Sequence, residues 1–191
     1  MISQDLFARF QQRLTAVGGE CHQVKDLAEA AEVIAAHSAL KENRLVIPPN
    51  FSERHPWGAI VPLLEGKGIQ IEEAQSPASV ADASAGLSHA ELAVAETGSV
   101  LIAENSLEAR VVSMLTLTHF ALLRADDLTG MLDTVGERLQ QLTRNGPDQR
   151  HYISLITGPS RTADIERTLT IGVQGPKALC VLFVKDWKAR L

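Results

Sequence analysis

The chain has 191 residues, of which 45% are hydrophobic and 21% charged, the balance of a globular protein with one sizeable core rather than a disordered or fibrous chain. A net charge of −5, 4% aromatic residues and the lack of a basic run argue against a nucleic-acid partner. Two cysteines are too few for a disulfide framework or a cysteine-ligated metal cluster, and no signal peptide or membrane-spanning apolar run is evident. We therefore expect a reduced cytoplasmic protein, a single domain over residues 1–191, with no cofactor or metal.

In chain order, the first half predicts short strands alternating with helices. Apolar residues at three- and four-residue spacing indicate a helix over residues 3–17, either within the domain or as a separate arm, and Gly18 and Gly19 end it. Residues 76–86 are rich in Ala and Ser, which is typical of a helix or a loop. The other predicted elements are strands near 21–24, 45–47 and 68–71, and helices over 27–34, with Asp26 as N-cap, and 59–64.

The second half is more regular, with apolar runs that predict buried strands. A long amphipathic pattern from Leu128 to Leu142 predicts a helix that ends at Asn145-Gly146-Pro147. The predicted strands cover residues 92–95, 100–103, 119–123, 152–156 and 179–184. The alternation of strands with amphipathic helices predicts an α/β layered fold with a largely parallel central sheet flanked by helices.

Ligands of such sheets bind beyond the carboxyl ends of the strands, and we expect two polar loops to emerge there. The first contains Glu96, Thr97, Gly98 and Ser99, which offer a carboxylate, two hydroxyls and a flexible backbone directly after an apolar strand. A tight turn, with Gly98 at positive φ, is the alternative that the pattern favours.

The second loop, residues 157–166, is the stronger candidate for a binding site. Gly158 allows close approach of the backbone, Ser160 and Thr162 offer hydroxyls, and Arg161 offers a forked cation suited to carboxylate or phosphate. A helix beginning at Asp164 would add amide donors and a partial positive charge. A capped helix start with a surface arginine is the alternative. The loop matches neither a Walker motif nor a dinucleotide-binding fingerprint.

A third loop contains Gly172, Gln174 and Gly175 and leads into the last strand. It is consistent with a loop that closes over a ligand or with a structural turn. The six histidines have no zinc-site spacing, and no nucleophile elbow is present. The sequence therefore assigns no catalytic residue.

Together the three loops resemble the LUD family, named for lactate-utilisation proteins. The resemblance rests on Ala95–Ser99, Arg110, Gly158–Glu166 and Gly172–Pro176. It implies a fold similar to that of sugar-phosphate isomerases and CoA-transferases, and a role in oxidising L-lactate to pyruvate. Within the family the chain is similar to the small C-type members, because the B-type members carry added ferredoxin-like cysteine clusters.

The chain departs from the family pattern at two positions. Ser99 stands where the family has Thr, which keeps the hydroxyl, and Gln174 stands where it has His, which removes a titratable group. Two hypotheses follow. The chain is a non-redox component whose partners are the iron–sulfur subunits of a lactate-utilisation system, or it is a small enzyme or binding protein for a carboxylate, sugar phosphate or acyl-CoA, held by the three loops.

Overall fold

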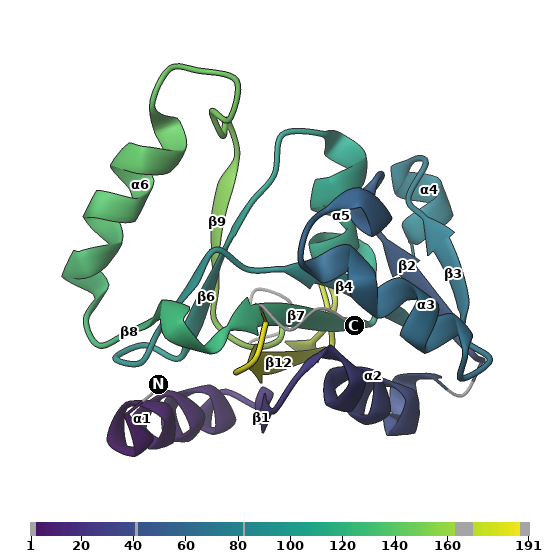
Figure 1. Ribbon diagram of the computed structural model, residues 1–191, viewed down its shortest axis with the longest axis horizontal. Helices are drawn as coiled ribbons and strands as arrows, with labels where there is room; N and C mark the ends of the chain where they lie inside the picture. The colour runs from purple at the N-terminus through teal and green to yellow at the C-terminus, as the bar shows by residue number, and fades with distance from the viewer. Residues whose placement is uncertain (1–2, 41, 82, 163–169, 188–191) are drawn as a thin grey trace.

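The computed structural model describes residues 3–40, 42–81, 83–162 and 170–187, and its centre is a six-stranded sheet (Figure 1). All neighbouring strands of this sheet run parallel. Their order is β1 (Glu20–Val24), β12 (Ala178–Val184), β7 (Thr118–Arg124), β4 (Ala85–His89), β2 (Arg44–Ile47) and β3 (Gln70–Glu73). The predicted α/β fold with a parallel central sheet is thus confirmed.

Helices cover both faces of this sheet because its inner strands are apolar on both sides. In β12, Cys180 and Leu182 pack with α2 (Leu27–Ala36) and α3 (Ile60–Glu65), whereas Val181 and Phe183 face the opposite side. On that side lie α1 (Gln4–Ala16), α4 (Pro77–Val80) and α5 (Leu107–Leu115).

The N-terminal helix α1 is packed into the core rather than standing apart as an arm. Its residues Phe10 and Leu14 are fully buried. The rings of Phe7 and Phe10 contact the Phe183 ring edge-on, with centroid distances of 5.4 and 5.0 Å. Such aromatic pairs add to the free energy gained from burial alone.

A second, four-stranded sheet lies beside the first. In chain order its strands come between β4 and β7 and between β7 and β12 of the parallel sheet. Its order is β8 (Leu128–Thr129), β5 (Leu92–Val94), β6 (Ser99–Ala103) and β9 (Ile153–Ile156). Helix α6 (Val135–Thr143) lies outside this sheet, at the left of Figure 1. A short pair of strands, β10 (Arg161–Thr162) and β11 (Thr170–Ile171), follows β9.

Three expectations about elements are wrong. The central strand β4 was not predicted, and it begins inside the segment assigned to a helix or loop. The predicted helix from Leu128 starts only at Val135, because Leu128 and Thr129 pair with β5. The strands at 92–95, 100–103 and 152–156 form, but they belong to the smaller, mainly antiparallel sheet.

The helices and strands predicted before residue 72 form close to their predicted bounds. Helix α2 begins where the side chain of Asp26 accepts a hydrogen bond from the Glu29 amide at 3.0 Å, as expected of an N-cap. Over the residues described, no helix combines the length and the apolar character that crossing a membrane requires.

Candidate functional site

The strand order places a crevice between β2 and β4. The chain leaves β2 toward β3 on one side and leaves β4 toward β7 on the other. Loops that diverge in this way open a gap at the carboxyl edge of a parallel sheet, where ligands of such folds bind. The loop after β2 holds two short 3₁₀ helices, Phe51–Glu53 and Trp57–Ala59, and the loop after β4 begins at Ala90.

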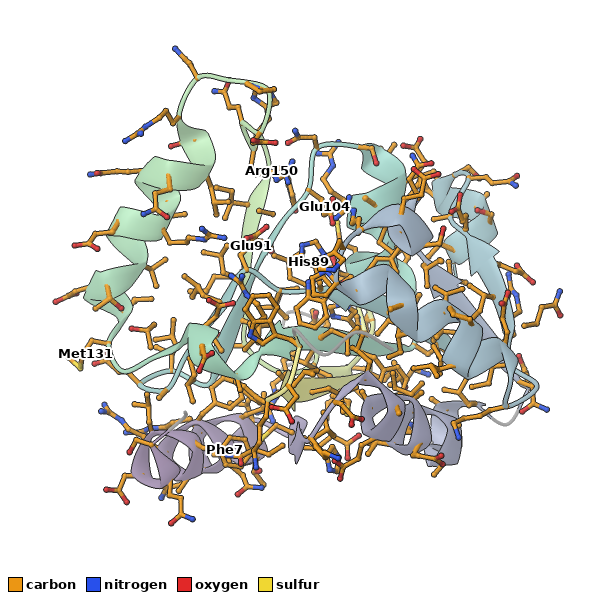
Figure 2. The ribbon with its side chains drawn as sticks, viewed as in Figure 1. Phe7, His89, Glu91, Glu104, Met131 and Arg150 are labelled. Atoms are coloured by element: carbon orange, nitrogen blue, oxygen red, sulfur yellow. The ribbon has the colours of Figure 1, made fainter. Side chains whose placement is uncertain are left out.

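A cleft of about 470 Å³ opens at this crevice, and we call it the arginine cleft. Figure 2 shows His89, Glu91, Glu104 and Arg150 gathered between α6 and the main sheet. The cleft is lined by Arg54, His55, Pro56, Trp57, His89, Ala90, Glu91, Arg124, Arg138 and Arg150. Four arginines in one cleft indicate a site for an anion.

Arg54 is held by a buried carboxylate at the wall of the cleft. Its two terminal nitrogens donate to the two carboxylate oxygens of Glu104 at 2.6 and 2.8 Å. Glu104 is 3% exposed and directly follows β6, so the pair joins the loop after β2 to the smaller sheet. Because this bidentate geometry uses one side of the guanidinium fork, Arg54 is fixed in orientation and its charge is compensated.

His89 and Glu91 form an ionisable pair at the floor. Nε2 of His89 lies 3.6 Å from a carboxylate oxygen of Glu91, and the side chains are only 13% and 11% exposed. Glu91 also accepts a hydrogen bond from Arg138 of α6. Burial acts to raise the pKa of Glu91, but the hydrogen bonds and charges of His89 and Arg138 outweigh it and lower the pKa to about 2. Glu91 is therefore ionised at neutral pH.

Aromatic side chains and a further ion pair complete the walls. The Trp57 ring stacks on His89 with a centroid distance of 6.4 Å. Arg124, at the end of β7, is paired with Asp127 and lies 4.9 Å from the Trp187 ring centroid. Burial raises the pKa of Asp127, against the lowering effect of Arg124. The charge of Arg124 is thus compensated, like that of Arg54.

Arg150 differs from the other three arginines. Each of the other three has an ion pair, whereas Arg150 has none among the described residues. Its buried Nε, like that of Arg138, has no hydrogen-bond partner there. Its backbone is nevertheless well placed, because the side chain of Asn105 donates to the Gln149 carbonyl and accepts from the His151 amide, both at 2.8 Å. A guanidinium that lines the cleft without an ion pair among the described residues is a group that a small carboxylate or phosphate can pair with.

The sequence-predicted loops lie at the opposite edge of the parallel sheet. Arg161 donates to the carbonyl of Val17, which caps α1 just before β1, at 2.6 Å. The Ser160 amide donates to Pro176, just before β12, at 2.9 Å. The expectation that these loops emerge at the carboxyl edge is therefore wrong, because the strands that precede them, β5 and β9, belong to the second sheet and not to the parallel sheet.

The first predicted loop is the tight turn that the pattern favoured. It joins the antiparallel strands β5 and β6 with Gly98 at φ 70°. A Cβ on Gly98 would stand 2.6 Å from the backbone nitrogen of Leu14, so the turn packs directly on α1. The carboxylate of Glu96 accepts from the Leu132 amide at 2.9 Å, which ties the turn to the start of α6.

Several predicted hydroxyls and glycines do come together at the amino edge. The Ser99 hydroxyl lies 2.7 Å from that of Thr97 and 2.6 Å from that of Thr157. The backbone carbonyl of Ser160 accepts a hydrogen bond from the Gly172 amide at 2.9 Å, and its side chain lies against Gly175.

The remaining predicted residues differ in their surroundings. Gly158, at φ 72°, lies so close to Val17 that a Cβ would stand 2.7 Å from its side chain. Thr162 pairs with Thr170 in the short β10–β11 ladder, and Gln174 is exposed. Asp164 lies outside the described residues. Arg110 stands over the Tyr152 ring, 4.8 Å from its centroid.

The residues of the arginine cleft were missed by sequence reasoning. Arg54 lies in a segment broken by Pro and Gly. His89 ends, and Glu91 follows, a strand whose sequence, Ala-Gly-Leu-Ser-His, lacks an apolar run. A usable signal was present, since Arg54 comes after the predicted strand 45–47 and Arg124 directly follows the predicted strand 119–123. Polar residues at the carboxyl ends of parallel strands are the expected place for a site.

The two cysteines are both buried and free. Burial, with a smaller effect of the Glu20 charge, raises the pKa of Cys21 to about 12. Burial and then the charge and hydrogen bond of Glu20 raise the pKa of Cys180. Neither thiol therefore has the character of a nucleophile in the chain alone.

Comparison with known proteins assigns the chain to a family. A family model described as the LUD domain matches residues 7–184. Lactate utilization protein C of Bacillus licheniformis is 25% identical over 181 residues, which cover 87% of this chain and 75% of that protein. The Geobacillus thermodenitrificans protein of the same name is 27% identical over 184 residues, 96% of this chain and 70% of the relative.

Other relatives match over a shorter region. Lactate utilization protein C of Bacillus velezensis is 32% identical over 104 residues, and the match spans only 43% of its length. Among solved structures, the crystal structure of a DUF162 family protein from Deinococcus radiodurans superposes with a TM-score of 0.65 at 22% identity, covering 94% of this chain and 96% of that one. That likeness shows a shared fold.

Proposed function

Because this chain belongs to the LUD-domain family, we propose that it is a non-redox component of an iron–sulfur lactate-utilisation system that supports the conversion of L-lactate to pyruvate. The relatives that carry the name Lactate utilization protein C support the assignment. The two cysteines of the chain are too few to ligate a cluster. We therefore assign the iron–sulfur centres to partner subunits.

The observation that carries a ligand-binding role is Arg150. Its guanidinium lines the arginine cleft without a carboxylate partner among the residues described, and Asn105 holds the backbone on both sides of Arg150 through the Gln149 carbonyl and the His151 amide. Lactate and pyruvate are small carboxylates, and a forked cation binds a carboxylate through two parallel hydrogen bonds. We propose that a carboxylate of this class binds there and couples the chain to the lactate-oxidising system.

The role in the system is tested by deletion and co-purification. Deletion of the gene is expected to impair growth on L-lactate, and tagged protein from lactate-grown cells is expected to recover cysteine-rich iron–sulfur proteins. Normal growth on lactate together with recovery of no such partner would contradict the role. Complementation by an Arg150→Gln variant then reports whether the cleft matters to the system.

Ligand binding is tested by thermal shift with L-lactate, pyruvate, sugar phosphates and acyl-CoA esters. The wild type is expected to gain thermal stability with one of these classes, because a ligand that binds only the folded state stabilises it. Arg150→Gln should lose this gain, and Arg144→Gln, an exposed arginine at the end of α6, should keep it. A flat response of the wild type to all classes would argue against a binding role.

A second candidate function is a small enzyme or binding protein for a larger anion. A neighbouring cavity of about 360 Å³ shares Arg54 and Arg150 with the arginine cleft, and cavities of about 300–1,000 Å³ hold ligands much larger than a three-carbon acid. We propose a fold of the sugar-phosphate isomerase and CoA-transferase type, which is consistent with such a ligand. Selective stabilisation by a sugar phosphate or an acyl-CoA ester, with no response to lactate, would favour this candidate.

A second candidate location is the amino-edge group of predicted residues. The proposed ligand groups there are Glu96, Thr97, Gly98, Ser99, Gly158, Ser160, Arg161, Thr162, Gly172, Gln174 and Gly175. Asp164, which the sequence adds to this set, lies outside the described residues. The exposure of Arg161 supports this location, although the hydrogen bond to Val17 occupies one of its nitrogens. Loss of ligand binding in Arg161→Ala, with binding retained in Arg150→Gln, would favour the amino edge.

A further inference from the structure

A separate group of ligating side chains lies where β1 and β12 run side by side. Glu20, His22 and Cys180 each offer one ligand atom, and the three atoms lie within 4.8 Å of one another. Glu20 and Cys180 are register partners in the parallel pair. His22 lies two residues beyond Glu20 and therefore projects from the same face of the sheet.

The carboxylate of this group is oriented by a fourth residue. Nε2 of His37, which caps the end of α2, lies 2.7 Å from Oε1 of Glu20. Nδ1 of His37 accepts a hydrogen bond from the Ala39 amide at 3.1 Å, so in the neutral ring Nε2 carries the hydrogen and donates it to Glu20. The other oxygen, Oε2, is 4.0 Å from Nε2 of His22. Hydrogen bonds of this kind orient the ligating groups of metal sites.

We propose that Glu20, His22 and Cys180 bind a divalent transition-metal ion of the zinc class. A carboxylate, an imidazole and a thiolate are the protein ligands that Zn²⁺ takes, and three of them with a water molecule complete a tetrahedral site. The side chains of Glu20 and His22 are 44% and 43% exposed, so an ion reaches them from solvent. Binding replaces the hydrogen of the Cys180 thiol with the metal, and the proton is released to water.

This metal site is distinct from the arginine cleft. Glu20 is the first residue of β1, and the cleft lies beyond the opposite ends of the parallel strands. The ion would link β1, β12 and, through His37, the end of α2, so its expected effect is on stability. Sequence spacing could not indicate it, because its ligands come from strands near the two ends of the chain.

The test is a metal titration of chelator-treated protein with Zn²⁺ and Co²⁺. We expect one ion per chain, a rise in thermal stability, and for Co²⁺ the near-ultraviolet thiolate-to-metal absorption that reports a cysteine ligand. Cys180→Ser should lose this absorption. Cys21→Ser should keep it, because Cys21 is buried on the opposite face of the same strand pair and serves as the matched control.

His22→Ala provides a second variant whose folding is not at issue, since its side chain is nearly half exposed. It should bind Co²⁺ at least about 10-fold more weakly than the wild type, and His37→Ala should bind it about 10- to 100-fold more weakly. His151 is an exposed histidine, and the control variant His151→Ala should bind Co²⁺ as the wild type does. Absence of Co²⁺ binding at micromolar concentration, unchanged affinity in His22→Ala, or thiolate absorption retained in Cys180→Ser would each overturn the proposal.

Discussion

The two edges of the parallel sheet hold polar side chains of different kinds. At the carboxyl edge, charged groups from β4, β7, α6 and the loop after β2 face one another across a cleft. At the amino edge, hydroxyls and glycines are engaged with each other and with the backbone of α1. The difference is one of charge: the carboxyl edge presents an arginine, Arg150, without an ion pair among the described residues, whereas the polar groups of the amino edge are hydrogen-bonded to one another or to the backbone.

We expect the free energy of unfolding to depend more on side-chain size at the amino edge than at the carboxyl edge. Gly98→Ala would place a Cβ 2.6 Å from the Leu14 backbone nitrogen at a positive φ, and we expect a loss of about 2–4 kcal/mol of unfolding free energy. Chemical denaturation measures it. Gly136→Ala in α6, where a Cβ meets open space, should instead gain about 0.5–1 kcal/mol. Equal effects of the two changes would contradict the close packing of the turn on α1.

At the carboxyl edge, changes of charge should alter stability and binding in opposite directions. Glu104→Gln removes the buried partner of Arg54, and we expect a loss of about 1–3 kcal/mol of unfolding free energy. The freed guanidinium should also raise the affinity of the cleft for an anion. Denaturation and ligand titration measure the two effects, with the exposed Glu65→Gln as control. Weaker anion binding in Glu104→Gln would show that Arg54 is not part of the ligand site.

The carboxyl edge should also respond to acid through Glu91. Its folded pKa is lowered from 4.5 to about 2, so its stabilising contribution is complete above pH 4.5 and is lost as the pH falls from 4.5 toward 2. The difference in unfolding free energy between wild type and Glu91→Gln should therefore shrink over that range, by about 2–3 kcal/mol. Urea unfolding at several pH values measures it. A difference that stays constant with pH would contradict the ion pair with Arg138 and His89.

The smallest effect is expected from Arg161→Ala. The side chain is exposed and donates to the carbonyl of Val17, the C-cap of α1, where a cation is worth about 0.3–1 kcal/mol. Denaturation of this variant beside the exposed Arg9→Ala measures the effect. A loss above about 2 kcal/mol would assign Arg161 a larger structural role than one hydrogen bond gives it.

The sequence patterns predicted the elements that have clear periodicity or caps. Helix α2 begins at its Asp26 cap, and β2, β7 and β12 are continuous apolar runs because both of their faces are buried. Strand β4 was not predicted because Gly86 and Ser88 interrupt its apolar run. Gly86 is required where Thr116 approaches closely, and Ser88 is paired with His119 at 2.7 Å.

The location of the candidate site could not be predicted from local patterns alone. The loop at 157–162 follows an apolar strand, as a site loop would, but β9 pairs with β6 outside the parallel sheet. The edge that a loop reaches depends on which strands pair, and the pairing strands lie far apart in the chain. The periodicity of a single sequence does not show which strands pair. Arg54 and Glu104 likewise meet only because the smaller sheet is inserted beside the loop after β2.

The most direct test of the account is calorimetric titration of the anion that stabilises the wild type, carried out with Arg150→Gln and Arg161→Ala side by side. The account predicts that Arg150→Gln weakens binding about 10- to 100-fold, because a charge-assisted hydrogen bond is lost, while Arg161→Ala binds as the wild type does. Unchanged affinity in Arg150→Gln, or loss of binding in Arg161→Ala alone, would contradict the assignment of the ligand to the arginine cleft.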